Sequence, residues 1–248
     1  MMKKTLGLIQ SRGIGDIIIA LPIAKYYHER GVEVHWPIDE HFLPSFRGAV
    51  DYVKFIPFPF QSTIDGFLNT PVTLLKAARC DRMIALYSFL SNVPVTNKAF
   101  FASLKFDEYK YAVAGVPFAE KWNLAITRDP AREQALFDAV VKSDDYVVVH
   151  KQGSNAHREV LVPPRYRKMQ CIEIDERTDC IFDWLLVLER ARFLLLIDSC
   201  FSNLVDQLGL KVAKQFMLRS DIRFTPVLRE DWSYYGEAAG AREMVVAP

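Results

Sequence analysis

The sequence has few cysteines, no long apolar run and no excess of charge of either sign. Its four cysteines are scattered, without a Cys-x-x-Cys pair or histidines at zinc-ligand spacing, so neither a zinc site nor a disulfide framework is predicted. They are typical of reduced core thiols in a cytosolic protein. The 31 basic and 30 acidic side chains leave a formal charge of +1, which gives no general attraction to nucleic acid or an anionic membrane. Any phosphate binding must therefore be local.

The apolar segments are too short or too interrupted to cross a membrane. Residues 184–197 are the most apolar late stretch, but Glu189, Arg190 and Arg192 interrupt them, whereas a membrane span needs roughly 20 apolar residues. The apolar run after the first lysines is shorter than a signal peptide requires. We expect a cytoplasmic protein with no membrane span. Peripheral association with a membrane is compatible with this composition.

The composition is that of a globular chain with a substantial core. Half of the 248 residues are hydrophobic and 25% are charged, and this length allows one large domain or two compact ones. In the first half, apolar runs alternate with segments of helical periodicity, which predicts a parallel sheet with helices on its faces. The expected strands are residues 5–10, 32–36, 52–56 and 83–87, and the clearest helix is 17–30.

The same alternation restarts after residue 128. Asp129-Pro130 is typical of a helix start, with Asp as N-cap and Pro at the first helical position, and Gly209 is typical of a helix end. Residues 57–71 and 105–128 show no clean period, and the first of these segments is interpreted as a loop on the substrate side or an irregular excursion. The expected later strands are 146–150, 171–174 and 193–197, and the expected helices are 129–142, 182–190 and 202–208.

The most informative feature is the turn Gly13-Ile14-Gly15-Asp16 between the first strand and the first helix. Glycines at such a turn let a ligand approach the backbone, and the start of the helix presents free N–H groups. A dinucleotide fingerprint needs a third glycine three residues after the second, but Ile18 stands there, which argues against NAD binding.

Asp16 itself has two interpretations. A carboxylate at the mouth of a sheet can take a proton from an incoming hydroxyl, and the helix dipole favours its charge. Alternatively, the side chain caps the helix and has no part in chemistry.

The turn and the residues after it resemble a known family. Gly15-Asp16, the apolar residues 17–21, Pro22 and a helix ending at Gly31 are similar to the opening of the ADP-heptose:lipopolysaccharide heptosyltransferases of glycosyltransferase family 9. In that family the aspartate of this motif is the base that activates the acceptor hydroxyl. The resemblance therefore implies that Asp16 is the catalytic base, with Gly13 and Gly15 forming the acceptor-side turn.

Two later segments resemble the same family in the expected order. The segment 151–155 follows an expected strand, and 158–167, with Pro163-Pro164, is similar to a basic segment that faces the donor phosphates, although it lacks the family's tryptophan. The segment 198–203 is similar to the Asp-Ser/Thr-Gly-x-x-His segment that begins a helix against the diphosphate, with Cys200 in place of the glycine and Asn203 in place of the histidine. The donor-binding residues implied are Lys151, Gln152, Ser154, Asn155, Arg158, Asp198, Ser199, Ser202 and Asn203.

The resemblance implies a two-domain fold of the GT-B type, with two Rossmann-like lobes facing an interlobe cleft. Residues 1–128 would bind the acceptor and residues 129–248 the nucleotide sugar. The expected reaction is an inverting transfer of a sugar from a nucleotide-sugar donor to a hydroxyl of a glycan or other acceptor, in lipopolysaccharide or other surface-glycan synthesis. The donor is a substrate, and neither a cofactor nor a metal ion is expected.

Other functions stay open at this level. A nucleotide-sugar epimerase or a DNA-modifying glycosyltransferase could use the same scaffold, although the sequence has no strong nucleic-acid signature. The substitutions at Cys200 and Asn203 also allow a non-catalytic nucleotide-binding relative. Of the five histidines, only His150 and His157 lie near the expected donor site. The late aromatic residues Trp232, Tyr234 and Tyr235 are interpreted either as a stacking surface for a sugar or base or as a segment packed across the two lobes.

Overall fold

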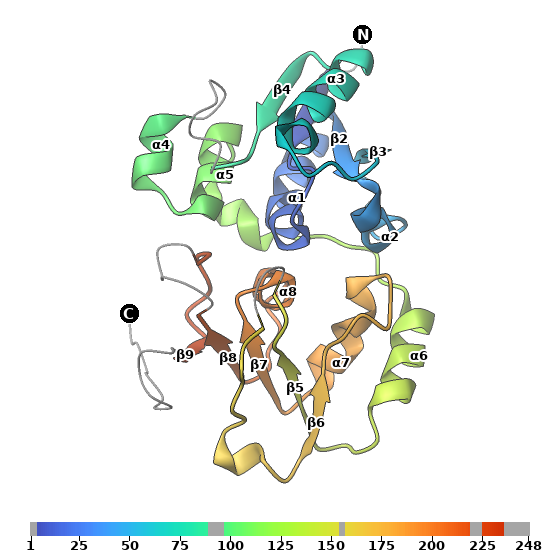
Figure 1. Ribbon diagram of the computed structural model, residues 1–248, viewed down its shortest axis with the longest axis vertical. Coiled ribbons are helices and arrows are strands. Elements are labelled where there is room, and N and C mark those ends of the chain that lie inside the picture. Colours follow the sequence, from blue (N-terminus) through green and yellow to red (C-terminus); the bar gives the residue numbers. More distant parts are fainter. Residues whose placement is uncertain (1–3, 89–96, 154–156, 219–224, 236–248) are drawn as a thin grey trace. The chain divides into compact units, whose positions relative to one another are not determined.

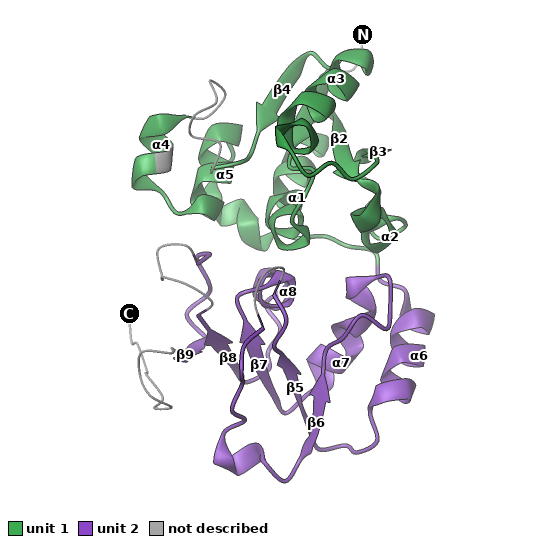
Figure 2. Cartoon of the chain, in the orientation of Figure 1, with its two compact units in different colours: residues 1–127 green, residues 128–248 purple. Residues whose placement is uncertain are grey.

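The protein consists of two compact units, which are seen in a computed structural model that describes residues 4–88, 97–153, 157–218 and 225–235 (Figures 1 and 2). Unit 1 spans Met1–Thr127 and unit 2 spans Arg128–Pro248. This division lies one residue before the domain boundary placed at the Asp129-Pro130 helix start. Each unit contains its own parallel sheet.

Unit 1 is built on a four-stranded parallel sheet with the strand order β3-β2-β1-β4. Leu6 of β1 lies opposite Val34 of β2 on one side and Arg82 of β4 on the other. Four of the five residues of β1 are buried, as expected for a central parallel strand covered on both faces. The strands are β1 (Thr5–Ile9), β2 (Glu33–Asp39), β3 (Lys54–Phe58) and β4 (Arg82–Ala85).

The helices of unit 1 pack around this sheet. Residues 17–24 of α1 are all buried, so this helix is a core element and not an amphipathic surface helix. The helix α3 approaches β1 closely, because a Cβ atom built on Gly7 would lie 2.5 Å from a methyl carbon of Leu75. The helices are α1 (Ile14–His28), α2 (Leu43–Phe46), α3 (Thr70–Ala77), α4 (Lys98–Ser103) and α5 (Phe106–Ala114), with a π-helical turn at Asp65–Asn69 and 3₁₀ turns at Glu40–Phe42 and Phe118–Trp122.

Unit 2 is built on a five-stranded parallel sheet with the strand order β6-β5-β7-β8-β9. Counted within the unit this is the order 2-1-3-4-5, which is common among doubly wound α/β folds. Alternate residues of β5 and β7 face two different core clusters: Val148 and Leu194 belong to one, and Val147 and Leu195 to the other. The strands are β5 (Tyr146–His150), β6 (Gln170–Glu173), β7 (Phe193–Ile197), β8 (Lys214–Met217) and β9 (Ser233–Tyr235).

The helix ends of unit 2 follow the capping residues in the sequence. Asp129 is the N-cap of α6, and its carboxylate accepts hydrogen bonds of 3.1 Å from the N–H groups of Ala131 and Arg132. Gly209 ends α8 with a positive φ of 64°. The helices are α6 (Pro130–Val140), α7 (Leu185–Arg190) and α8 (Cys200–Leu208), with 3₁₀ turns at Pro164–Tyr166 and Ile181–Trp184.

Two expectations need correction. The segment 57–71 is not one irregular loop, because it contains the end of β3, the π-helical turn and the start of α3. The helix α1 begins at Ile14, three residues earlier than expected, so Gly15 and Asp16 lie within its first turn. The late aromatic residue Tyr234 lies in β9, and the indole N–H of Trp232 donates a 3.0 Å hydrogen bond to Asp206 Oδ1. The two interpretations of this aromatic segment stay predictions.

Candidate functional site

The strand order of each sheet indicates where a ligand would bind. In open α/β sheets, ligands bind outside the carboxyl ends of the strands, at the point where the direction of strand addition reverses. That point lies between β1 and β4 in unit 1 and between β5 and β7 in unit 2. The residues that follow these four strands include most of the residues singled out in the sequence.

Asp16 follows β1, as the third residue of α1. Gly13 is the N-cap of this helix with φ 78°, a conformation that favours glycine, and the helix has no side-chain cap. Asp16 Oδ1 instead forms an ion pair of 2.9 Å with Lys110 Nζ of α5. The side chain of Asp16 is 38% exposed, whereas that of Lys110 is 2% exposed. The carboxylate therefore pairs with a buried ammonium on one side and is open to solvent on the other.

The rest of this turn is tied to the end of β4. The N–H group of Arg12 donates a 3.1 Å hydrogen bond to the hydroxyl oxygen of Tyr87, which also lies 3.0 Å from Ser11 Oγ. Burial raises the pKa of Tyr87 well above its usual value, so this phenol stays neutral. Arg12 also donates to Gln61 O at 2.7 Å and lies over the ring of Phe60. These bonds hold the turn that presents Asp16.

The site of unit 2 is centred on His150 and Ser199. His150 is the last residue of β5 and Ser199 is the N-cap of α8, and His150 Nδ1 lies 2.9 Å from Ser199 Oγ. The imidazole ring packs edge to face on Phe201, with 4.8 Å between ring centroids. Burial lowers the pKa of His150 to about 4, so the ring is neutral near pH 7. The sequence predicts that His150 lies near this site but does not identify it as a site residue.

Ser202 and Asn203 complete the first turn of α8. Ser202 Oγ donates to Ser199 O at 2.9 Å and accepts from the N–H of Ser199 at 3.0 Å, so both hydrogen-bonding directions of this buried hydroxyl are used within the helix. Asn203 Nδ2 also donates to Ser199 O at 2.9 Å, while Asn203 Oδ1 is buried without a partner among the described residues. Ser202 and Asn203 thus fix the backbone of Ser199.

The other expected donor residues form a second group after β5. Lys151 Nζ pairs with Glu173 Oε2 of β6 at 2.8 Å, and Lys151 O accepts a 3.0 Å hydrogen bond from the N–H of Arg158. Gln152 forms an isolated antiparallel bridge with His157. Asp198 is buried directly before Ser199. Ser154 and Asn155 lie outside the described residues.

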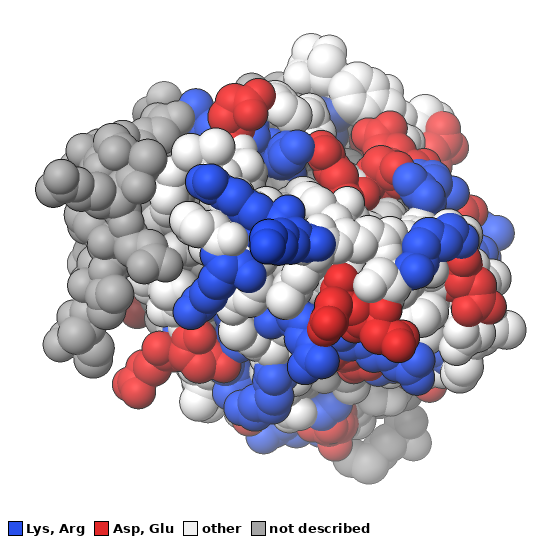
Figure 3. Space-filling view, turned by 90° about the horizontal axis from the view of Figure 1, so that it is seen from below, with Lys and Arg blue, Asp and Glu red and all other residues white. Residues whose placement is uncertain are grey.

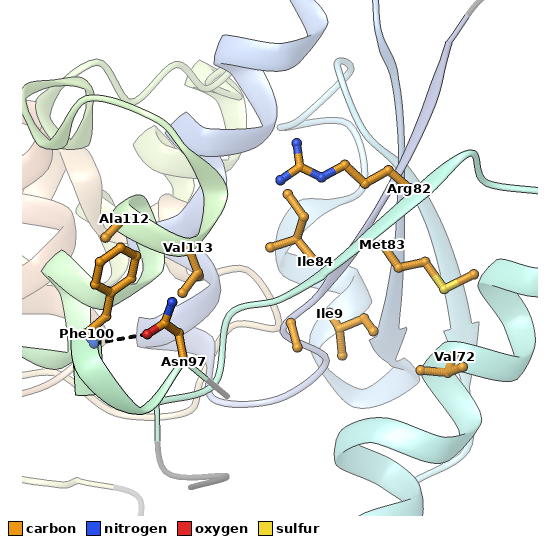
Figure 4. A pocket seen from close by; sticks show the side chains of 10 residues that line it. Ile9, Val72, Arg82, Met83, Ile84, Asn97, Phe100, Ala112 and Val113 are labelled. Atoms are coloured by element: carbon orange, nitrogen blue, oxygen red, sulfur yellow. Dashed lines mark hydrogen bonds between the residues drawn. The ribbon is translucent and has the colours of Figure 1, made fainter. Parts of the chain in front are cut away.

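A separate hollow of about 550 Å³ lies beside β4, which is an edge strand of the sheet in unit 1 (Figure 4). Most of its lining residues are apolar, among them Ile9 and Ile84 from the sheet and Val72 from α3. Asn97 accepts a 3.2 Å hydrogen bond from the N–H of Phe100. Asp16 is not among the lining residues, so this hollow is distinct from the candidate site.

The charges of the protein do not form a surface of one sign on the face seen in Figure 3, where basic and acidic side chains are interspersed. Over the described residues, no helix is long and apolar enough to span a membrane. In the same part of the chain, no cluster of three or more His, Cys, Asp or Glu side chains could hold a metal ion. The expectation that the reaction needs no metal or cofactor stays a prediction.

No family model and no curated protein matches the sequence, whereas solved structures do. A glycosyl transferase family 9 protein from Veillonella parvula is similar with a TM-score of 0.64 and 13% identity, covering 95% of this chain and 88% of that chain. E. coli heptosyltransferase WaaC with ADP is similar with a TM-score of 0.53 and 13% identity, covering 94% of this chain and 93% of that chain. The chain has the fold of these glycosyltransferases.

A third similar structure is the iron-containing dodecameric glycosyltransferase TibC from enterotoxigenic E. coli, with a TM-score of 0.52 and 11% identity over 87% of this chain and 58% of that chain. The structural likeness agrees with the resemblance found in the sequence. It confirms an α/β fold with parallel, Rossmann-like sheets. The arrangement of the two lobes around a cleft and the roles of individual residues stay predictions.

Proposed function

We propose that the protein is a glycosyltransferase that moves a sugar from a nucleoside diphosphate sugar to an acceptor hydroxyl. The observation that carries this proposal is the position of Asp16, a solvent-facing carboxylate at the strand-order reversal of the first sheet. The fold supports it, because solved structures with this fold include heptosyltransferases, one of them with ADP. Surface-glycan synthesis, including that of lipopolysaccharide, is the process we assign to the reaction.

In this proposal unit 2 binds the donor. The helix dipole places a partial positive charge at the N-terminus of α8, and the first turn has no acidic residue, so this end of the helix favours the negative charge of a diphosphate. Ser199 presents its hydroxyl at this point. Lys151 and Arg158 lie on the neighbouring loop and supply positive charge near the phosphates. The donor is a substrate, and the proposed reaction uses no cofactor and no metal ion.

Unit 1 presents the acceptor. As the acceptor oxygen attacks the anomeric carbon, Asp16 takes the proton of that hydroxyl, and a new carbon–oxygen bond forms. The bond from the anomeric carbon to the phosphate oxygen breaks, and the nucleoside diphosphate leaves with the bonding electrons. A single displacement of this kind inverts the configuration at the anomeric carbon. The GT-B arrangement of two lobes, with residues 1–128 as the acceptor domain and 129–248 as the donor domain, is part of the proposal.

The four free cysteines support a cytoplasmic location for this enzyme, since disulfides are rare in the reducing cytosol. We include peripheral contact with a membrane in the proposal, because surface glycans are commonly assembled on lipid-linked acceptors.

The donor can be identified by binding and turnover. A thermal-shift screen with ADP, UDP, GDP, CMP and dTDP and their sugars should raise the melting temperature for one nucleotide class, because a ligand that binds only the folded state stabilises it. ADP-heptose is the first donor to test. Release of nucleoside diphosphate that depends on an acceptor supports transfer. A new nucleotide sugar formed without acceptor indicates an epimerase, and binding without any turnover indicates a non-catalytic relative.

The base is tested by Asp16→Asn. This variant should transfer sugar about 10²- to 10⁴-fold more slowly while binding the donor normally, because general-base catalysis contributes a factor of this size. Asp51→Asn is the matched control, since it removes an exposed carboxylate from the same unit. Full transfer activity in the Asp16→Asn enzyme would show that another group is the base.

A further inference from the structure

Lys110 is a buried lysine on α5 whose ammonium meets three acceptors. Its Nζ lies 2.7 Å from Gln10 Oε1, 3.2 Å from Leu86 O and 2.9 Å from Asp16 Oδ1. An ammonium has three N–H donors, so every donor has a partner. Because an unpaired buried charge is strongly unfavourable, this complete set of partners is what allows a lysine at this depth.

The three partners come from the segments that meet at the reversal point of the first sheet. Gln10 follows β1 and Leu86 follows β4, while Asp16 lies in the first turn of α1. Gln10 is itself fixed. Its side-chain Nε2 donates to Arg12 O at 2.8 Å, and its backbone carbonyl oxygen accepts from Trp36 Nε1 at 2.9 Å. Gln10 and Leu86, at the ends of two sheet strands, therefore hold the ammonium independently of its contact with the Asp16 carboxylate.

This arrangement gives the two oxygens of Asp16 different surroundings. Oδ1 contacts Lys110, and Oδ2 lies against Gly13, where an added Cβ would come within 2.8 Å of it. No other hydrogen bond or ion pair of the Asp16 side chain is present in the part of the chain that the structure describes. A single contact from the buried side thus sets the direction in which the carboxylate points.

We propose that Lys110 is a positioning residue that holds the Asp16 carboxylate in the orientation required to accept a proton. The inference rests on the proposed role of Asp16 as base. Lys110 is buried behind Asp16 and acts through its carboxylate rather than on the substrate. It follows that the sheet, through Gln10 and Leu86, determines the position of the base.

Kinetics of Lys110→Met test this role with the nucleotide sugar that the wild-type enzyme turns over. We expect kcat to fall about 10- to 100-fold with an unchanged KM for the donor, since a misplacement of about 1 Å can cost a factor of this size. The double variant Asp16→Asn/Lys110→Met should be no slower than Asp16→Asn, because Lys110 acts only through Asp16. Additive losses, or an unchanged kcat in Lys110→Met, would overturn the inference.

Lys25→Met is the matched control. It removes a partly buried lysine that pairs with Glu29 on α1, away from the first turn of that helix, and it should leave kcat unchanged. If Lys110→Met does not fold, Lys110→Gln replaces it, since a neutral amide can still donate to Gln10 Oε1 and Leu86 O. A slow Asp16→Asn enzyme together with a wild-type kcat in the Lys110 variant would disprove the positioning role of Lys110 and leave the proposed function intact.

A crystal structure of the Lys110 variant tests the inference without any substrate. The Asp16 carboxylate should leave its place against Gly13 and turn toward solvent. If it keeps the wild-type side-chain conformation, Lys110 does not position it. If the wild-type enzyme turns over no nucleotide sugar, the proposed function fails, and this crystallographic comparison still decides whether Lys110 orients Asp16.

Discussion

Unit 1 and unit 2 both place their candidate residues at the carboxyl edge of a parallel sheet, but the groups there differ in charge. In unit 1 a half-exposed carboxylate, Asp16, pairs with the buried ammonium of Lys110. In unit 2 the neutral imidazole of His150 is hydrogen-bonded to Ser199 at the start of α8. The first helix has an acidic residue in its first turn and α8 has none.

In the proposed function this difference corresponds to two chemical tasks on the same scaffold. A carboxylate at the N-terminus of α1 uses the helix dipole to favour its own negative charge, as suits a base. A neutral pair at the N-terminus of α8 leaves the dipole available to an anion from outside, as suits a diphosphate. The units are thus related in architecture, while the groups paired at the two helix starts differ in charge.

The largest stability effect is expected for the buried ion pair of unit 1. Lys121 Nζ and Asp107 Oδ2 are 2.8 Å apart and both side chains are fully buried. Lys121→Met should lower the free energy of unfolding by about 3–5 kcal/mol, because Asp107 loses its counter-charge inside the core. Urea denaturation followed by tryptophan fluorescence measures this. A loss near zero would mean that the pair contributes no more than a surface contact.

The second effect concerns His150 and depends on pH. Its pKa is about 4 in the folded protein and 6.5 in the unfolded chain, so the unfolded state binds more protons between these values. Stability should therefore fall as the pH drops from 6.5 to 4, by about 3 kcal/mol from this group. In His150→Asn this part of the pH dependence should vanish. An unchanged pH dependence in that variant would contradict the buried neutral imidazole.

The third prediction compares the effect of substituting two glycines with positive φ, one in each unit. Gly13→Ala should cost about 1–2 kcal/mol through backbone strain. It should also slow transfer, because the new methyl would meet Asp16 Oδ2 at 2.8 Å. Gly209→Ala in unit 2 has strain of a similar kind, but its nearest atom is Arg229 at 3.5 Å, so the rate of transfer should not change. Equal transfer rates for the two variants would show that Gly13 has no special role in positioning Asp16.

The smallest effect is expected for an exposed ion pair of unit 2. Arg192 Nε and Asp145 Oδ1 are 2.8 Å apart, but both side chains are more than half exposed. Asp145→Asn should therefore leave the urea midpoint almost unchanged, since solvent and salt screen such pairs. A clear loss of stability in this variant would show that the contrast between the buried and the exposed ion pair is smaller than their burial indicates.

The sequence predicts the central strands well. β5 and β7 match the expected residues 146–150 and 193–197, because a continuous run of four or five apolar residues is typical of a strand buried on both faces. The start of α6 follows from Asp129 and Pro130. By contrast, the sequence does not predict β8, which begins with a lysine. Lys214 is buried because its ammonium donates to Leu210 O and pairs with Asp231, which local pattern does not reveal.

The candidate site is predicted only in part for a related reason. Asp16 and Ser199 are recognisable because glycines or small polar residues follow an apolar run at the end of a strand. Lys110 is not recognisable, because a lysine in a short helix is normally interpreted as a surface residue. Its partner Gln10 is 100 residues away in the chain, so only the tertiary structure brings them together. Long-range polar contacts of this kind leave no periodic signal in the sequence.

The close approach of α3 to β1 also bears on how this sequence can diverge. Gly7 has no side chain where Leu75 fills the space above the strand, and a methyl group there would overlap the end of that leucine. A larger residue at position 7 therefore requires a smaller one at position 75, or a displaced helix. Among homologous sequences these two positions should change together, so a correlated pair at 7 and 75 would record this contact in evolutionary data.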